Sequence, residues 1–367
     1  MRRALRLGAG NLLVLCLLLA LVELGGQTYA TLHPAYQGLT MEPDRAIGWK
    51  LVPGLAWTST GNYWYARDYS VPVRTSALGF RDRERAEAKP AGTLRVAVLG
   101  DSFVQAVQVP LEKTATQILE QRLEAAPPKG FGHAEVLNFG IANHGVGQCL
   151  LTWEAYAQRF APERVAVFVG GFHMRRTVAK YEGSLADPSR PRLWIRPTFS
   201  LGDDGALVRE PARDYDKFLA AQQDAIARVF AGQRMRRAPH GWFLAWYARE
   251  LGRALGLVEP DEPWQALPQR TLDINLKILS ELGDAVQARG GRLGIADASL
   301  YFEPGDTAVA AALERLCKDR GLDYIPLANR LLDANQAGQQ TRWPHDGHFN
   351  EAGNRVFAEA LFDWVKG

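Results

Sequence analysis

The sequence of 367 residues has little of what marks several common classes of protein. It contains only three cysteines and no C-x-x-C pair or His/Cys cluster, so neither a disulfide framework nor a structural metal site is predicted. No low-complexity run or short-period repeat occurs, which argues against disorder and against a solenoid. Neither sign of charge dominates, because the sequence contains 43 Lys and Arg residues and 40 Asp and Glu residues. The formal net charge of +3 is too weak to indicate nucleic-acid binding.

Two of the cysteines, Cys149 and Cys317, lie in apolar segments with helical periodicity. These two cysteines could be buried free thiols, or they could form a disulfide with each other. The third, Cys16, lies in an apolar run at the N-terminus and does not follow a small residue, so no lipoprotein site is predicted there.

Long apolar runs are also scarce, and the clearest one is at the N-terminus. Arg2, Arg3 and Arg6 precede the run from Leu12 to Val22, which is typical of a secretory signal or signal-anchor. Residues 1–30 are therefore expected to form a signal-anchor or a cleaved signal peptide. Because the arginines should stay in the cytoplasm, the rest of the chain is expected outside it, anchored in a bacterial inner membrane or secreted.

The remaining chain divides into a lead-in region and an α/β domain. Residues 31–92 are rich in Gly, Pro, Trp and Tyr and predict short strands and turns. From residue 93 to residue 367, short apolar runs alternate with helix-periodic segments, such as those at residues 112–125 and 149–160, which predicts a parallel sheet with helices on both faces. Residues 175–268 interrupt this rhythm and predict a helical insertion, with helices around residues 214–230 and 242–255. Its aromatic residues are expected to be core, or to stack on sugars or rest at a membrane: Trp242, Phe243, Trp246, Tyr247 and Trp264.

A possible nucleophile follows the first predicted strand of the domain, at Gly100–Phe103 (GDSF). A serine at a strand-to-helix turn lies at the carboxyl edge of the sheet, where open α/β folds bind ligands. The helix amino terminus favours negative charge that develops there. Ser102 is therefore a candidate nucleophile, although Asp101 and Ser102 could also be simple helix caps.

A possible base and its partner lie just before the last predicted helix, in the sequence from His345 to Asn354 (HDGHFNEAGN). Asp346 could accept from one ring nitrogen of His348 while the other nitrogen faces the serine, which is how the members of a catalytic triad divide their roles. Asn350 could cap the helix. A metal site that includes His345 is the alternative, although it would need further ligands.

Together, the G-D-S and D-x-H motifs resemble the SGNH/GDSL hydrolase family from about residue 94 to the C-terminus, without the insertion. The resemblance implies a three-layer, flavodoxin-like parallel sheet and a serine mechanism that uses no cofactor and no metal. It gives Ser102, His348 and Asp346 the catalytic roles. The lead-in sequences Gly48–Gly54 and Gly79–Asp82 resemble those of a membrane-anchored bacterial branch linked to polysaccharide assembly.

The oxyanion hole departs from the family pattern in two places. The family's glycine after the second strand corresponds here to Asn143, whose backbone N–H could still donate. The family's asparagine after the third strand is missing, since the chain reads Gly170, Gly171, Phe172, His173. His173 could donate in its place from a ring N–H, whereas Phe172 could not. A lost oxyanion donor typically costs about a hundred- to a thousandfold in rate.

These features predict an O-acyl, and specifically acetyl, esterase or acyltransferase that acts on envelope or exported carbohydrate. The short D-x-H spacing resembles that of polysaccharide O-acetylesterases and O-acetyltransferases. The expected partners are an acylated carbohydrate or small ester and the inner membrane, with no nucleic acid. Two alternatives stay open, which are an inactive SGNH-like glycan-binding or scaffold protein and a metal-dependent hydrolase.

Overall fold

The computed structural model describes residues 2–32, 40–63, 66–184, 192–212, 216, 220, 266–305 and 307–367. Contacts divide the chain into two compact units. One comprises Met1–Gln37, Gly183–Leu193 and Asp216–Gln265, and the other comprises Gly38–Glu182, Trp194–Tyr215 and Ala266–Gly367. The second unit contains both the lead-in hairpins and the α/β sheet.

The N-terminal segment forms one long helix, α1 (Arg2–Leu32). Its apolar side chains between Leu12 and Leu24 are exposed. No helix in the described part of the chain is both long enough and apolar enough to cross a membrane.

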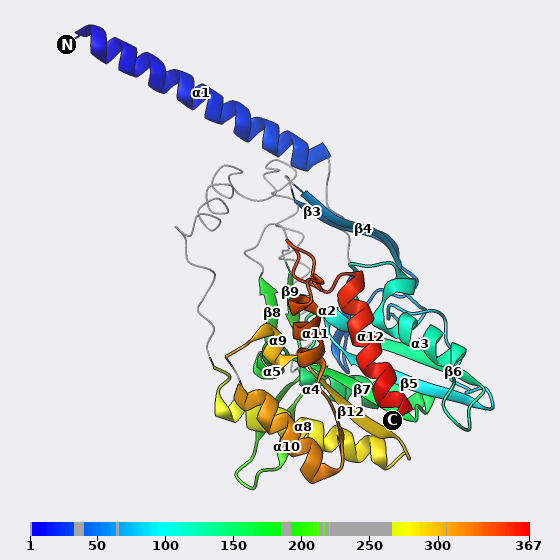
Figure 1. The fold of residues 1–367 in the computed structure, drawn as a ribbon. Helices are drawn as coiled ribbons and strands as arrows, with labels where there is room; N and C mark the ends of the chain where they lie inside the picture. Colours follow the sequence, from blue (N-terminus) through cyan, green and yellow to red (C-terminus); the bar gives the residue numbers. More distant parts are fainter. Residues whose placement is uncertain are drawn as a thin grey trace. The chain divides into compact units, whose positions relative to one another are not determined.

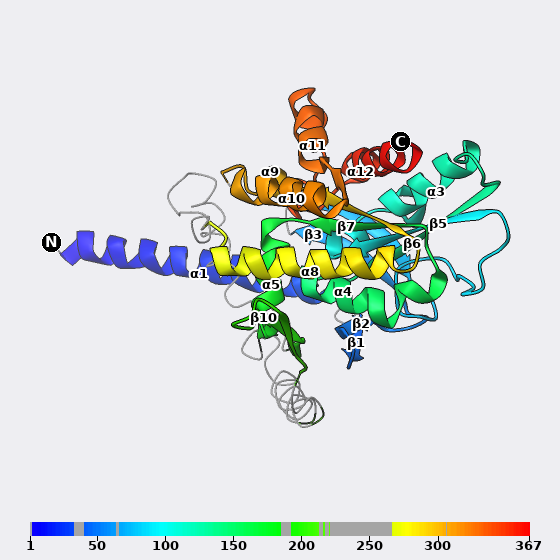
Figure 2. The same ribbon diagram turned by 90° about the horizontal axis from the view of Figure 1, so that it is seen from below.

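The described residues form one five-stranded parallel sheet (Figures 1 and 2). Its strands, in their spatial order, are β6 (His133–Gly140), β5 (Thr93–Gly100), β7 (Arg164–Val169), β12 (Arg292–Asp297) and β13 (Asp323–Ile325). Counted along the chain, this order is 2-1-3-4-5, the flavodoxin-like arrangement, so the predicted fold class is confirmed. The strand order reverses between β5 and β7, and this switch point is where such sheets bind ligands.

Helices cover both faces of the sheet, as expected for buried strands that read as continuous apolar runs. The flanking helices are α3 (Ala115–Ala125), α4 (Val146–Ala155), α8 (Gln269–Gln287), α10 (Thr307–Arg320), α11 (Leu327–Gln336) and α12 (Glu351–Lys366). Figure 2 shows α4 and α8 on one side of the sheet and α3 and α12 on the other.

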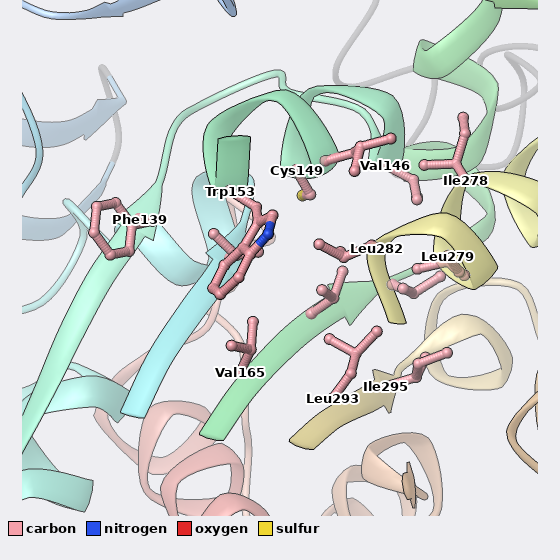
Figure 3. Close-up of a cluster of buried hydrophobic side chains, with 14 of the residues drawn as sticks. Phe139, Val146, Cys149, Trp153, Val165, Ile278, Leu279, Leu282, Leu293 and Ile295 are labelled. Carbon is pink, nitrogen blue, oxygen red and sulfur yellow. The ribbon is translucent and has the colours of Figure 1, made fainter. Parts of the chain in front are cut away.

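Alternate residues of each strand enter two separate cores, because side chains along a strand point to opposite faces. On β5, Ala97 and Leu99 pack in the core with α4, α8 and α10, whereas Val96 and Val98 pack in the core with α3, α11 and α12. Figure 3 shows the first core, where Trp153 and Cys149 of α4 lie over the strands. The sheet and both helical layers therefore form a rigid base beneath the carboxyl edge.

The predicted elements differ from the structure mainly at their ends. The helix expected from residue 112 begins at Ala115, because Thr114 caps it by accepting from the Gln117 N–H and residues 111–113 form a 3-10 turn. The helix expected at residues 149–160 ends as a 3-10 turn at residues 157–160. The sequence did not predict α11, the short α9 (Ser299–Phe302) or α5 (Gly171–Val178).

The predicted insertion begins within helix α5 (Gly171–Val178) and contains strands that the sequence did not predict. These are β8 (Tyr181–Ser184), β9 (Arg192–Ile195), β10 (Thr198–Leu201) and β11 (Leu207–Glu210). Strands β10 and β11 pair antiparallel. The predicted helices at 214–230 and 242–255, and the aromatic residues from Trp242 to Trp264, lie outside the described residues.

The lead-in region forms two antiparallel hairpins, β1 (Met41–Asp44) with β2 (Gly48–Leu51) and β3 (Ala56–Tyr63) with β4 (Ala66–Arg74). It is not peripheral to the domain. Ile47, Trp49 and Phe80 are buried within the core that also holds α4 and α8.

Candidate active site

The turn after β5 presents Ser102 at the carboxyl edge of the sheet, next to the switch point. Helix α2 (Ser102–Gln105) starts at this serine, and Asp101 is its N-cap, accepting from the Phe103 N–H at 3.0 Å. Asp101 therefore has the simple capping role considered above. Ser102 does not cap this helix, and its side chain is available for other contacts.

Ser102, His348 and Asp346 form a continuous hydrogen-bonded chain. The Nε2 atom of His348 lies 2.8 Å from the Ser102 Oγ. The Nδ1 atom of the same ring hydrogen-bonds to Asp346 Oδ1, which also accepts from the His348 backbone N–H at 3.2 Å. The loop before α12 thus brings together residues that are 246 positions apart in sequence. This is the geometry in which a histidine can take the serine proton while a carboxylate orients the ring.

Asp101 also makes a buried ion pair beside the serine. Its side chain is fully buried, and its Oδ2 accepts from Arg176 Nη1 at 2.7 Å. The Arg176 guanidinium lies over the ring of Phe172, 5.1 Å from the ring centroid. Helix α5, which carries both residues, is therefore tied to the nucleophile turn by a charge-assisted hydrogen bond.

Asn143 lies after β6 with a φ of +64°, in the left-handed region that asparagine tolerates better than most residues. Two buried side chains hold this loop. The Asn143 carbonyl accepts from Arg196 Nη1 at 3.1 Å, and the Ala142 carbonyl accepts from Trp49 Nε1 at 3.0 Å. The backbone of the loop is thus fixed at the same sheet edge as Ser102, where its N–H could act as a donor.

The structure does not bring His173 to the serine. Its side chain is fully buried in α5, and its Nε2 lies 3.9 Å from the Cys149 Sγ on α4. Neither ring nitrogen hydrogen-bonds to Ser102 or His348, and Nδ1 has no hydrogen-bond partner among the described residues. The prediction that His173 is an oxyanion donor is therefore not favoured, because the rotation of α5 turns the ring towards the core.

Burial also keeps His173 neutral, because it lowers the pKa of the ring to about 4, with the nearby Arg176 adding to the effect. Burial likewise lowers the pKa of His144 well below 6.5. In the unfolded chain each ring would accept a proton below about pH 6.5. The unfolded state therefore binds more protons than the folded state as the pH falls from about 6.5 towards 4.

We expect acid to destabilise the fold in this window. Between pH 7 and pH 5, His173 alone should lower the free energy of unfolding by about 2 kcal/mol. Urea unfolding at the two pH values measures this, and His173→Leu should show a correspondingly smaller loss. The control is His133→Leu at an exposed histidine, which should keep the wild-type pH dependence. The same pH dependence in wild type and His173→Leu would contradict the expectation.

Phe172, rather than His173, stands beside the serine turn. It packs against Phe103 and Phe302, with ring centroids 5.8 and 5.1 Å away, and Phe103 in turn contacts the His348 ring at 4.9 Å. The three phenylalanines are partly exposed. They form an apolar wall next to the His348 ring.

His345 contacts an acid of the lead-in region. Its Nδ1 lies 2.7 Å from Asp68 Oδ1, on strand β4. Among the described residues, no group of three His, Cys, Asp or Glu side chains is arranged to hold a metal ion. The metal-dependent alternative thus finds no ligand cluster in the described part of the chain.

Cys149 and Cys317 are both buried and free in this structure, so they do not pair. Burial raises the pKa of both thiols, which makes them poor nucleophiles.

Sequence reasoning missed three residues at the site, which are Asp68, Tyr69 and Arg176. Asp68 and Tyr69 contact the loop that carries Asp346, and Arg176 pairs with Asp101. Strand periodicity around Tyr69 was visible in the sequence. The pairing with a loop 277 positions away was not, because nothing in the local pattern records it.

No protein-family model matches the chain, and no curated protein matches its sequence. Several solved structures are similar. The acetyl xylan esterase AlAXEase is 14% identical, with 74% of this chain and 100% of that chain covered and a TM-score of 0.39. The α/β hydrolase LAE5 from the Lake Arreo metagenome is 13% identical, with 74% and 94% covered and a TM-score of 0.41. A member of the lipolytic G-D-S-L family from Veillonella parvula is 12% identical, with 74% and 97% covered and a TM-score of 0.39. At these identities and TM-scores, the similarities say nothing about what this chain acts on.

Proposed function

We propose that this chain is a serine hydrolase of the SGNH/GDSL type that cleaves ester bonds, with Ser102 as nucleophile, His348 as base and Asp346 as orienting carboxylate. The observation that carries the proposal is the 2.8 Å contact between His348 Nε2 and Ser102 Oγ, extended through Nδ1 to Asp346. Serine is a weak nucleophile alone, and a base within hydrogen-bond reach activates it. The G-D-S and D-x-H motifs support the same assignment.

The reaction begins when His348 takes the Ser102 proton as the serine oxygen attacks the ester carbonyl carbon. The carbonyl oxygen gains the negative charge, and the backbone N–H groups of Ser102 and Asn143 stabilise it. His348 then gives its proton to the leaving alcohol, and an acyl-enzyme remains. Water resolves this intermediate in an esterase, whereas a sugar hydroxyl resolves it in an acyltransferase.

The proposed substrate is an O-acetylated sugar, and the short D-x-H spacing of Asp346 and His348 supports it. The wall of Phe103, Phe172 and Phe302 offers an apolar surface beside His348 against which an acyl methyl group or a sugar ring can pack. The basic and apolar N-terminus supports placing this activity outside the cytoplasm.

Labelling with a fluorophosphonate tests the nucleophile directly, because the reagent reacts with an activated serine. We expect the wild-type chain to be labelled, and we expect Ser102→Ala to remain unlabelled. Ser299→Ala is the matched control, since Ser299 is a buried serine that follows another strand of the same sheet, β12. Labelling of the Ser102→Ala chain at the wild-type level would refute the assignment.

A second candidate function is a glycan-binding or scaffold protein with an inactive site. Its support is that the family's asparagine is missing from residues 170–173 and that the His173 side chain is buried beside Cys149. Absence of labelling in the folded wild-type chain, together with binding of an acetylated polysaccharide, would favour this candidate over the esterase.

A further inference from the structure

The lead-in hairpin β3–β4 lies outside the parallel sheet, yet it contacts the loop that carries Asp346. The Tyr69 hydroxyl donates to Asp346 Oδ2 at 2.9 Å. The other carboxylate oxygen, Oδ1, accepts from both the ring and the backbone of His348. One carboxylate oxygen of Asp346 therefore contacts the hairpin, and the other contacts His348.

The Tyr69 side chain is itself held in place. It is 9% exposed and packs in a small cluster with Val71 and Val73 of the same strand. Its ring lies 5.7 Å from that of Trp343, which belongs to the segment leading into the Asp346 loop. A phenol fixed by packing can hold the carboxylate in one orientation, because its hydroxyl has little freedom to follow a moving acceptor.

Asp68, the neighbouring residue on β4, holds the backbone of the same loop. Its Oδ2 accepts from the backbone N–H of His345 at 2.9 Å and of Asp346 at 3.2 Å. Its side chain is only 5% exposed. Asp68 fixes the main chain at Asp346, and Tyr69 fixes the side chain, so one strand determines both.

The electrostatics of Asp346 agree with this geometry. Burial by itself would raise the pKa of Asp346, but the hydrogen bonds from His348, the charge of His348 and the Tyr69 hydroxyl outweigh burial. Together they hold the pKa of Asp346 below its ordinary value. The carboxylate therefore stays ionised while it orients the imidazole.

We propose that Tyr69 and Asp68 are positioning residues of this active site, so that the lead-in hairpin extends the Ser102–His348–Asp346 chain by a fourth member. The proposal rests on the proposed function of Ser102. It assigns the hairpin a role in orienting the base, beyond any part it has in folding.

The test compares Tyr69→Phe with Tyr324→Phe in the full-length chain. Both variants remove a tyrosine hydroxyl that donates to an aspartate carboxylate, since the Tyr324 hydroxyl donates to Asp297 Oδ2 at 2.7 Å. With p-nitrophenyl acetate, we expect Tyr69→Phe to lower kcat on the order of tenfold with KM unchanged. The acid limb of its kcat/KM profile should move to higher pH, because a carboxylate with fewer donors holds the protonated imidazole more strongly. Tyr324→Phe should have the kcat, the KM and the pH profile of the wild type.

A second variant covers the case in which Tyr69→Phe does not fold. Asp68→Asn keeps one acceptor oxygen but loses the charge that faces the loop amides, and it should lower kcat as Tyr69→Phe does. If a variant that folds keeps the wild-type kcat and pH profile, the inference is wrong. The proposed mechanism of Ser102 would not be affected by that result.

A spectroscopic measurement separates this inference from the proposed function. The His348–Asp346 hydrogen bond should give a low-field imidazole N–H signal in the proton NMR spectrum, which His348→Gln removes. Tyr69→Phe should shift that signal, and Tyr324→Phe should not. If Tyr69→Phe shifts the signal but the chain shows no turnover that depends on Ser102, the positioning role is supported and only the proposed esterase function is rejected. An unchanged signal would reject the positioning role.

Discussion

Ser102→Ala and His348→Ala should each reduce hydrolysis of p-nitrophenyl acetate by the full-length chain to the background rate. We expect a loss of about 10⁴-fold or more for an enzyme that works at the full rate of a serine triad. If the missing asparagine has already slowed the wild-type enzyme, the measurable loss becomes smaller by about a hundred- to a thousandfold. The reason for equal losses is that the serine and histidine act as one unit, so that removing either leaves only the oxyanion donors.

The double variant supplies a further check. Because the two residues share one function, Ser102→Ala combined with His348→Ala should be no slower than either alone. Ser299→Ala should retain the wild-type rate, which shows that the assay reports this serine rather than a loss of folded protein. If His348→Ala retains substantial turnover that depends on Ser102, another group is the base and the triad assignment fails.

The second large effect is expected from Gly140→Ala, at the end of strand β6. A Cβ atom added at Gly140 would lie 2.3 Å from the Gln105 backbone nitrogen and 2.7 Å from the Val104 carbonyl carbon. These are backbone atoms of α2, the helix that starts at Ser102, so no flexible side chain can move aside. Either α2 shifts or the strand does.

The nucleophile helix has little freedom to shift. Arg81, which is buried, donates to the carbonyl oxygens of Gln105 at 3.2 Å and Val109 at 2.5 Å, and also to that of Ala106. We therefore expect Gly140→Ala to lower kcat/KM on the order of a hundredfold, because a displacement of about 1 Å misaligns the serine. Overpacking should also lower the free energy of unfolding by about 1–3 kcal/mol.

Gly132→Ala is the matched control, just before the start of the same strand. A Cβ atom there has no neighbour within 4 Å, so both activity and the urea unfolding midpoint should stay near wild type. Equal activity of Gly140→Ala and Gly132→Ala would mean that the close approach of β6 to α2 does not position Ser102.

The sequence by itself determined the sheet and the two motifs at its edge. Apolar runs such as residues 94–99 predicted buried strands, and the alternation with helices predicted a parallel sheet, because these patterns reflect burial of both faces. Ser102 and His348 were predicted because each lies in a local motif whose residue types suit the chemistry. The structure then places their side chains in contact.

Only the tertiary structure decided what surrounds these motifs. The sequence left open whether His173 could donate to the oxyanion. The rotation of α5 turns its ring towards Cys149, and residue order alone does not give a helix's rotation about its axis. The lead-in region was expected to lie beside the domain, yet Trp49 is buried in its core and Tyr69 contacts Asp346. Local periodicity records which residues of a segment are buried, whereas contacts between residues hundreds of positions apart depend on how the whole chain packs.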